Sequence, residues 1–488
     1  MRKRMTKKDS DAVVVGSGPN GLAAAITMQR AGLSVLLLEA KDTIGGGLRT
    51  KELTLPGFKH DVCSAIHPLA AGSPFFQQLP LHEYGLEYIY PGVSAAHPFD
   101  DGSAAALTRS LEETARSLGQ DEKTYLKLIE PLTKDWPGLA PDVLGPLQFP
   151  SHPIALAKFG LDAITSAEFL SKRFVTKEAK GLWGGMAAHS IQPLSNIASS
   201  AIGLVLLTTG HLRGWPVPKG GSQSIATALA AYFESLGGKI ETNFEVKHLD
   251  QLPTSNALLF DVTPKQLMKI AGPRFSSVYK WQLNRYRYGM GVFKIDWALN
   301  EAIPFTAEKC RRAGTIHLGN TFAEIARSEL QTSKGKVAEK PFVLLAQQSL
   351  FDASRAPEGK HTAWAYCHVP NGSQVDMTEI IENQVERFAP GFRDTILAKC
   401  TMNTAQIEAY NSNYIGGDIN GGVIDISQLY TRPSIQISPY RTSAKGMYIC
   451  SSSTPPGGGV HGMCGYYAAK RALKDVFNLT EKIGLAQG

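Results

Sequence analysis

Residues 11–50, DAVVVGSGPNGLAAAITMQRAGLSVLLLEAKDTIGGGLRT, decide the fold of this chain. They open with an apolar, β-branched run at 12–15, which is typical of a buried parallel strand. Glycines follow at G-x-G-x-x-G spacing, at Gly16, Gly18 and Gly21. The first permits a tight turn, the second lets backbone approach a diphosphate, and the third lets a helix pack closely on the strand. The segment therefore predicts the start of a nucleotide-binding βαβ unit.

The rest of this unit supports the same interpretation. Pro19 and Asn20 lead into a predicted helix at 21–31, whose N-terminal N–H groups and dipole favour a diphosphate. The next apolar run ends at Glu39, followed by Ala40. A carboxylate at that strand end accepts hydrogen bonds from a ribose and disfavours a 2′-phosphate. An ordinary βαβ unit with a glycine-rich turn is the alternative, but it does not explain Glu39.

The segment after this acid contains Gly46, Gly47, Leu48 and Arg49. It resembles the G-G-x-x-R-[ST] segment of FAD-dependent amine oxidases and carotenoid desaturases, which runs beside the diphosphate toward the flavin. The resemblance implies FAD as the cofactor. The third residue of that segment is often Arg in those families, whereas here it is Gly47. One basic contact is therefore missing, and we expect Arg49 to supply the charge; a surface arginine is the alternative.

The far end of the chain supplies a second motif. Residues 446–450 predict a strand, 451–465 are mostly small residues, and 466–476 predict a helix. This order resembles the C-terminal flavin motif of the phytoene-desaturase type. Glycines let backbone approach a flat ring, and a helix N-terminus stabilises the negative charge of a reduced flavin. A glycine-rich surface loop is the alternative. The residues expected at the cofactor here are Gly457, Gly458, Gly459, Val460, His461 and Gly462.

Composition limits the classes of function. A chain of 488 residues is expected to form two or three domains, and its net charge of +7 comes partly from a basic tail at residues 1–8. Nucleic-acid binding is therefore not expected. The six cysteines show no C-x-x-C or zinc-ligand spacing, which predicts free thiols, a reducing compartment and no metal. No apolar run reaches membrane-spanning length, so we expect a cytoplasmic protein. The oligomeric state cannot be predicted.

Because the two flavin motifs stand at opposite ends, one domain must close from both termini. We expect an α/β fold in which a Rossmann-type FAD-binding domain with a parallel βαβ sheet is interleaved with a mixed-sheet substrate domain and a helical insert. In the resembled families the Val246 backbone lies by the adenine, and a strand is expected to begin there. The predicted boundaries are 1–75, 214–256 and 442–488 for the FAD-binding domain, 76–109 and 257–441 for the substrate domain, and 110–213 for the insert.

The insert is expected to line an apolar tunnel to the flavin. Prolines after residue 132 predict that a helix ends there, and residues 154–174 predict a further helix. That second helix mixes large apolar residues with Lys158, Lys172 and Arg173, as an interfacial helix does. Peripheral contact with a membrane surface is one expectation; an amphipathic helix packed on its own domain is the alternative.

Over nearly its full length the chain resembles the phytoene-desaturase-like branch of the FAD-dependent amine-oxidase superfamily, near the pyridine nucleotide-disulfide oxidoreductase-domain-2 proteins. The resemblance implies an FAD-dependent oxidoreductase of desaturase, dehydrogenase or isomerase type. Hydride would pass between flavin N5 and an apolar isoprenoid, polyene or lipid-like substrate. Disulfide reduction is not expected, because no C-x-x-C is present. An amine oxidase and a flavin-binding scaffold without turnover remain alternatives.

The first candidate for a catalytic base is His461, because it lies inside the flavin motif. Capping or packing at the helix start is its alternative role. The other candidates, each with a structural alternative such as core packing or an Asx-turn, are His189, His211, Asp418 and Asn420. Cys464 is a candidate covalent tether of the flavin, and a small packed cysteine is its alternative role.

Overall fold

The computed structural model describes residues 10–429 and 431–479, so the basic tail at residues 1–8 lies outside it. The predicted βαβ unit is confirmed: β1 (Ala12–Val15), α1 (Pro19–Arg30) and β2 (Val35–Leu38) follow in order. They belong to a five-stranded parallel sheet with the strand order β16-β10-β1-β2-β9. The other strands of this sheet are β9 (Lys239–Glu241), β10 (Ala257–Phe260) and β16 (Met447–Ile449).

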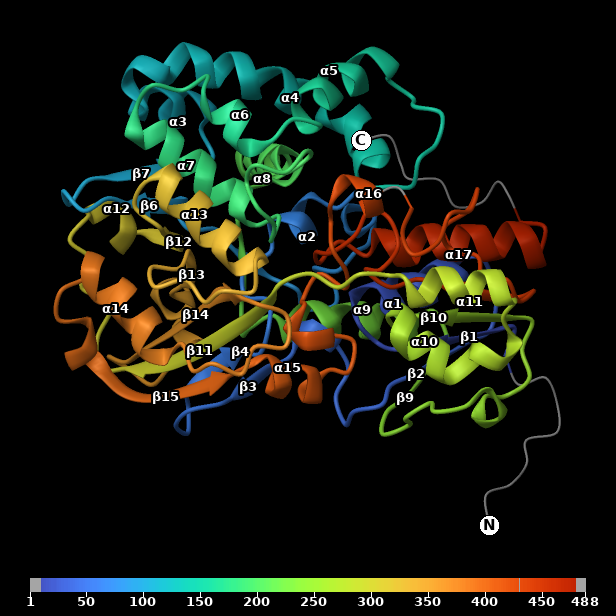
Figure 1. Cartoon of the computed structure of the whole chain (residues 1–488). Coiled ribbons are helices and arrows are strands. Elements are labelled where there is room, and N and C mark those ends of the chain that lie inside the picture. Colours follow the sequence, from blue (N-terminus) through green and yellow to red (C-terminus); the bar gives the residue numbers. More distant parts are fainter. Residues whose placement is uncertain (1–9, 430, 480–488) are drawn as a thin grey trace.

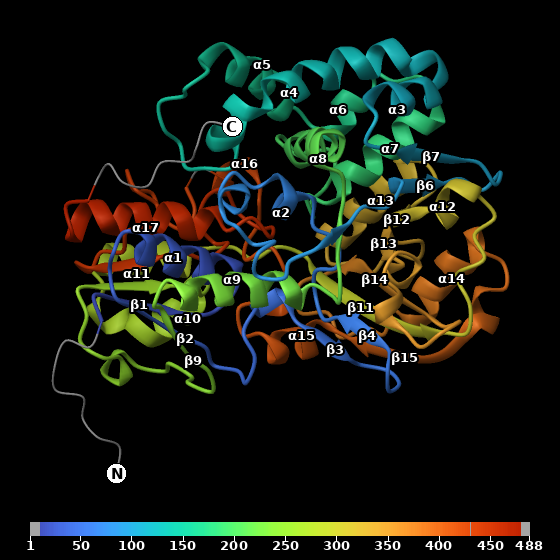
Figure 2. The same cartoon turned by 180° about the vertical axis from the view of Figure 1, so that it is seen from behind.

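Helices cover both faces of the parallel sheet (Figures 1 and 2). Val14 of β1 faces the core shared with α1, α9 (Gln223–Ser235) and α17 (Met463–Val476). Val13 faces a second core, formed with α10 (Pro264–Ala271) and α11 (Ser277–Asn284). Helices α1 and α17, from opposite ends of the chain, pack closely against each other. Gly465 permits this approach, because a Cβ there would collide with the Asn20 backbone. The two termini therefore close one layered unit, as expected.

The predicted boundary at residue 257 is wrong for the segment that follows it. Strand β10 pairs in parallel with β1, from Ala257 opposite Ala12 to Phe260 opposite Val15. The next two helices, α10 and α11, pack on the same sheet. The error arose because the sequence of a short apolar strand does not indicate which of two sheets the strand joins. The strand expected to begin at Val246 is also absent, and that residue lies in a loop.

The second sheet is mixed and has the order β15-β11-β14-β13-β12-β6-β7, with only the β12–β6 pair parallel. Its register places side chains in rows. His317, Leu344 and Tyr366 lie opposite one another across three strands, and Thr315, Ala346 and Trp364 form the adjacent row on the same face. The strands are β6 (Val93–Pro98), β7 (Ala104–Leu107), β11 (Gly291–Leu299), β12 (Ala313–Leu318), β13 (Val343–Ala346), β14 (His361–Val369) and β15 (Ile396–Met402).

The two faces of the mixed sheet pack against different partners. Val343, Leu345 and Ala365 face a core shared with α14 (Thr378–Phe388). Leu344 and Trp364 face the opposite core, which includes α7 (Lys177–Ala188) and α8 (Ser200–Arg213). The remaining helices and strands outside the helical insert are α2 (Pro68–Gly72), α12 (Glu308–Arg311), α13 (Phe322–Ser333), α15 (Thr404–Tyr410), α16 (Ile426–Leu429), β3 (Thr50–Glu52), β4 (Lys59–Asp61), β5 (Tyr88–Ile89) and β8 (Val217–Pro218).

The insert is helical, but two expected helix ends are wrong. After α3 (Leu111–Ser117), α4 (Glu122–Val143) continues through three prolines, because its buried stripe around Trp136 packs against the rest of the insert. The helix expected at 154–174 is divided into α5 (Pro153–Ala163) and α6 (Ala167–Ser171). Ser166 caps the second piece by accepting a hydrogen bond from the Phe169 N–H.

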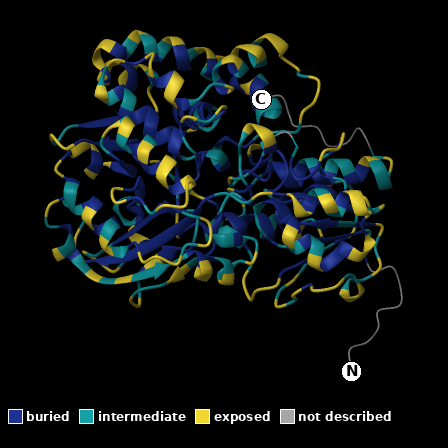
Figure 3. Cartoon of the chain, viewed as in Figure 1, coloured by how far each residue is buried: buried dark blue, intermediate teal, exposed yellow. Residues whose placement is uncertain are grey.

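Part of α5 and α6 is coloured as exposed in Figure 3, and several of the exposed residues are apolar. Phe159 is buried, whereas Ile154, Leu161 and Phe169 are exposed. Phe159 therefore packs into the core as the amphipathic alternative predicts, whereas Phe169 lies on the outer surface. Within residues 10–429 and 431–479, no helix combines the length and apolar character needed to cross a bilayer.

Candidate functional site

One cavity of about 770 Å³ runs from the parallel sheet to the face of the mixed sheet beneath α7 and α8. It brings together most of the residues that the two motifs predicted. Those lining it are Gly16, Gly18, Pro19, Asn20, Glu39, Ala40, Gly46, Gly47, Leu48, Arg49, Val246, Gly458, Gly459 and Val460. The predicted residues Gly21, Gly457, His461 and Gly462 stand behind its wall.

The G-x-G-x-x-G loop forms a narrow cradle at the N-terminus of α1. Gly16 has a φ of +102°, a left-handed conformation that glycine adopts without strain. Gly18 precedes the helix, and a Cβ on Gly46 would lie only 3.1 Å from the Gly18 Cα atom. Nearby, the buried Oδ1 of Asn20 has no partner within the described residues. Close backbone and a free helix N-terminus fit a diphosphate.

Glu39 lies at the end of β2, where all four acceptor positions of its carboxylate are used. The Ser17 N–H and hydroxyl donate to Oε2 at 3.1 and 2.5 Å. The Lys41 N–H donates to Oε1 at 2.9 Å, and Arg49 Nη2 donates to it at 3.1 Å. A ribose hydroxyl can therefore bind Glu39 only by replacing one of these donors. The Ser17 hydroxyl can rotate to release its position.

Arg49 does not play the expected role of a free charge beside the diphosphate. Its side chain is buried, and besides Glu39 it donates to the carbonyl oxygens of Thr43 and Gly46 at 2.6–3.2 Å. It therefore holds the glycine-rich loop against the acid. Gly47, which stands where the resembled families often have Arg, is also explained: a Cβ there would collide with the Tyr414 hydroxyl.

A second acid, Asp261, lies in the cavity wall at the end of β10. The Gly21 N–H donates to its Oδ2 atom at 2.9 Å, and the same oxygen would be 2.7 Å from a Cβ on Gly18. Burial raises the pKa of this carboxyl to about 7. Sequence reasoning missed Asp261, although it follows a parallel strand just as Glu39 does.

The C-terminal motif meets the cavity through its glycines. Gly458 packs against Asn420, and a Cβ on Gly459 would lie 2.8 Å from Leu69 Cδ1. The predicted base His461 is instead a cap: its Nδ1 accepts a hydrogen bond from the Met463 N–H at 3.0 Å, and burial lowers its pKa to about 4. Its catalytic role is therefore not supported, because it does not line the cavity.

The far half of the cavity, which we call the chamber, is mostly apolar. Its walls come from the segment after α7, from α8, from the mixed sheet and from a loop before α16. The apolar and aromatic residues that line it are Ile191, Ile202, Leu206, Trp215, Leu344, Trp364, Tyr366, Ile419 and Ile424. The expectation that the insert lines an apolar passage is met by the segment after α7 and by α8 rather than by residues 154–174.

His189 is the polar residue that the insert contributes to the chamber. It directly follows α7, and its Nε2 atom lies 2.9 Å from Nε2 of His317 on β12. The Trp215 ring packs edge-on against His189 at a centroid distance of 5.5 Å. Burial lowers the pKa of both histidines, to about 3 for His189, so both rings are neutral near pH 7.

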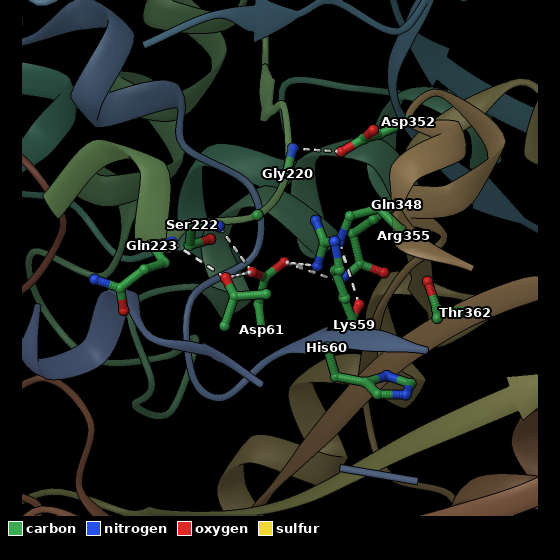
Figure 4. A network of polar contacts seen from close by, with 12 residues as sticks. Lys59, His60, Asp61, Gly220, Ser222, Gln223, Gln348, Asp352, Arg355 and Thr362 are labelled. Carbon is green, nitrogen blue, oxygen red and sulfur yellow. Dashed lines mark hydrogen bonds and ion pairs between the residues drawn. The ribbon is translucent and has the colours of Figure 1, made fainter. Parts of the chain in front are cut away.

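A buried ionic network anchors the opposite wall (Figure 4). Asp61 on β4 accepts hydrogen bonds from Arg355 Nη2 at 2.7 Å and from the Ser222 N–H at 2.8 Å. The Ser222 hydroxyl donates to the Ser64 carbonyl, so His67 Nε2–H must donate to the Ser222 oxygen at 2.7 Å. His67 lines the cavity, and burial lowers its pKa to about 4. The network joins β4 to the residue before α9 and to the segment that precedes β14.

The remaining predicted candidates have structural roles. His211 bonds the Tyr125 hydroxyl at 2.7 Å outside the cavity. Asp418 forms the expected Asx-turn by accepting from the Asn420 N–H, and Asn420 itself lines the cavity. Cys464 is buried and lies outside the cavity. The described residues contain no cluster of His, Cys, Asp and Glu suited to a metal.

Apart from His189, which was a candidate from the sequence, the chamber residues were missed because no local motif marks them. Trp364 and Tyr366 alternate along β14, and alternation on a strand is the one signal that could have placed them on a common face. That signal could not identify the face as a cavity wall, since the register with β12 and β13 is a property of the folded sheet.

Comparison with known proteins agrees with this geometry. The sequence model of the family "Flavin containing amine oxidoreductase" matches residues 20–266. The mouse pyridine nucleotide-disulfide oxidoreductase domain-containing protein 2 is 24% identical over 97% of this chain and 95% of its own length. A lycopene-forming phytoene desaturase from a Paracoccus species is 23% identical over 93% and 95%. An oxidoreductase from Methanosarcina mazei has the same fold, with a TM-score of 0.62, 16% identity and coverage of 93% and 98%.

Proposed function

Because the chain belongs to the flavin containing amine oxidoreductase family, we propose that it is an FAD-dependent oxidoreductase that exchanges a hydride with an apolar substrate. The single observation that carries this proposal is the continuity of the cavity. It joins the two glycine motifs to a chamber whose walls are mainly apolar and aromatic. The predicted resemblance to the phytoene-desaturase-like branch is confirmed by the relatives, which supports an isoprenoid, polyene or lipid-like substrate.

The residues at the two glycine motifs fit FAD. Gly18 and Gly46 leave room for a diphosphate at the N-terminus of α1, and Glu39 stands at the strand end where a ribose binds. Gly458 and Gly459 bring backbone to the other side of the cavity. When bound there, FAD supplies a two-electron acceptor whose N5 atom takes or gives the hydride. The chain's own part is to hold the cofactor, exclude water and orient the substrate.

Among the described residues, no carboxylate lines the chamber: the acids that line the cavity, Glu39, Glu245 and Asp261, all stand at the cofactor end. This supports a neutral substrate. A desaturation also releases a proton, and burial lowers the pKa of His189 to about 3, so this neutral ring is a weak proton acceptor.

An amine oxidase remains a second candidate because of one observation. Trp364 and Tyr366 form an edge-to-face pair, with ring centroids 5.2 Å apart, in the chamber wall. Aromatic faces attract cationic amines as well as apolar groups. The family itself includes amine oxidoreductases, so amines belong in any substrate screen.

The test is anaerobic reduction of the flavin in the purified protein by candidate substrates, followed by reoxidation. We expect polyenes or terpenes to bleach the visible flavin band and simple primary amines to leave it unchanged. Bleaching by amines, with slower reduction when the α-hydrogen is replaced by deuterium, would favour the amine oxidase. A photoreduced flavin that neither oxygen nor a quinone reoxidises would favour a flavin-binding scaffold without turnover.

A further inference from the structure

The chamber holds polar groups that the protein does not satisfy. The Thr315 hydroxyl and the Trp364 Nε1–H are buried and have no hydrogen-bond partner within the described residues, although both residues line the cavity. Leaving such a group unpaired costs about 1–3 kcal/mol, and native proteins keep few of them without a reason. Both atoms are enclosed by neighbouring protein atoms, so a polar atom of a ligand must instead be met by a group that the cavity exposes.

His189 is the group best placed to meet a polar atom of that ligand. The hydrogen bond to His317 and the edge of Trp215 fix its ring, which leaves Nδ1 as the nitrogen available to the cavity. No hydrogen-bond partner for Nδ1 exists within the described residues, and unlike the buried nitrogens it is not enclosed by protein atoms.

The surroundings of His317 decide which nitrogen carries the proton. One neutral ring must donate and the other must accept across the Nε2–Nε2 bond. His317 Nδ1 is enclosed against Gly185, where a Cβ would lie 2.5 Å from it, and it has no acceptor. Buried N–H groups without acceptors are rarer than buried lone pairs without donors. His317 therefore donates through Nε2–H, and His189 carries its proton on Nδ1, the atom that faces the chamber.

We propose that His189 donates a hydrogen bond to a single acceptor oxygen of the substrate, so that the substrate class is an oxygenated apolar molecule such as a terpenoid ketone, aldehyde or alcohol. The inference rests on the proposed function, because it assumes that the chamber is the substrate side of the flavin. It deepens that function by naming an orienting contact: one hydrogen bond fixes which carbon of an otherwise featureless skeleton reaches the flavin end.

The experiment measures the binding of two probes with the same carbon skeleton, menthone and p-menthane, to the flavin-loaded protein. Quenching of tryptophan fluorescence is the readout, because Trp215 and Trp364 line the chamber. The two ligands differ in their transfer free energy from water. The decisive quantity is therefore the change that one substitution causes in the affinity for each probe, rather than the ratio between the probes.

His189→Leu is expected to weaken menthone about tenfold, the loss of one buried hydrogen bond, and to change p-menthane by less than about threefold. His189→Asn keeps an amide group near the position of Nδ1 and is expected to recover part of the menthone affinity. The matched control is His211→Leu. It removes a histidine–tyrosine hydrogen bond from the same helical cover but lies outside the cavity, so it should affect both probes equally.

The outcomes separate this inference from the proposed function. An equal loss of both probes in His189→Leu, or no selective loss of menthone, would overturn the role of His189 while leaving an apolar chamber beside FAD. A flavin-loaded wild-type protein that binds neither probe would instead contradict the proposed apolar substrate. If His189→Leu fails to fold, His189→Asn decides the matter: the inference requires its loss of affinity to be less than tenfold for menthone yet larger for menthone than for p-menthane, and an equal loss of both probes would overturn it.

Discussion

The two ends of the cavity treat their polar groups in opposite ways. At the cofactor end, the Glu39 carboxylate accepts four hydrogen bonds, and the Arg49 guanidinium is used within the loop that it holds. In the chamber, His189 Nδ1 has no protein partner within the described residues and is not enclosed, although Nε2 of the same ring bonds His317. A preorganised site suits a resident cofactor, whereas unpaired groups leave part of the interaction to a ligand that comes and goes. The fold therefore supplies the hydrogen bonds of the cofactor end by itself, whereas a bound substrate would complete those of the chamber.

The largest effect is expected where a glycine supports the cofactor end from behind. Gly462 has a φ of +69°, and a Cβ would lie 2.7 Å from the Phe76 ring and 2.9 Å from Ala23. Gly462→Val should therefore lower the free energy of unfolding by about 3–6 kcal/mol through backbone strain and overpacking. Chemical denaturation measures it. Gly462 does not line the cavity, so its surroundings predict loss of stability rather than loss of flavin chemistry alone.

Gly459→Val is the matched comparison, because Gly459 lines the cavity and its nearest atoms are the end of a leucine side chain. The φ of +121° at Gly459 also strains a valine, so this variant should lose stability too, but only here should the folded protein also lose FAD. Equal FAD content per folded chain in the two variants would show that the glycines have no separate roles.

Asp261 gives the cofactor end a pH dependence. The folded pKa is about 7, whereas an unfolded aspartate titrates near 4, so the folded chain binds the extra proton between these values. Stability from this group is therefore fully present below about pH 4 and is lost as the pH rises to about 7. Asp261→Asn should remove that loss, which is roughly 3–5 kcal/mol. Urea unfolding of both proteins at pH 5 and 8 provides the measurement. A constant difference between them would mean that the carboxyl is ionised throughout.

Substitution of Glu39, whose carboxylate accepts four hydrogen bonds, is expected to have a smaller effect than the preceding changes. Glu39→Gln keeps the size of the side chain but removes the charge, and FAD affinity should fall by about 10–100-fold, the worth of a charge-assisted hydrogen bond. Glu39→Ala should be worse in stability as well, since it leaves the buried Arg49 unpaired. Titration of the apoprotein with FAD gives both affinities. If Glu39→Gln binds FAD with wild-type affinity, the Glu39 carboxylate supports only the glycine-rich loop and does not bind the cofactor.

The smallest effect on stability is expected at the outer cover of the chamber. We propose that the exposed apolar side chains of α5 and α6, with Lys158 and Lys172, meet an anionic bilayer; neither lysine has an ion pair within the described residues. Phe169→Glu should change stability by less than about 0.5 kcal/mol but reduce flotation with anionic vesicles. Phe159→Glu is the buried counterpart and should unfold the helix. Flotation that Phe169→Glu leaves unchanged, or none by the wild type, would contradict membrane contact.

The contrast between the cofactor end and the chamber also explains which parts of the molecule could be predicted from the sequence. Glycine spacing, Glu39 and the C-terminal motif are local signals, so the cofactor end and the parallel sheet follow from short segments. The chamber arises from the cross-strand register of β12, β13 and β14 and from helices that lie more than a hundred residues away in the sequence. The sequence also does not show whether a polar side chain already has hydrogen-bond partners in the fold. Arg49 was expected to bind the diphosphate, but it donates to the Thr43 carbonyl; His461 was expected to act as a base, but it caps the following helix.

The central claim is that the two glycine motifs hold FAD at one end of a continuous cavity. Heat denaturation of the purified protein, with chromatography and mass analysis of the released nucleotide, tests it most directly. We predict a yellow protein that releases about one FAD per chain, because the described part of the chain shows no cysteine in the cavity wall other than Cys63, whose thiol pKa is raised by burial and which is therefore a poor covalent tether. A colourless protein that takes up NAD and not FAD would contradict the account.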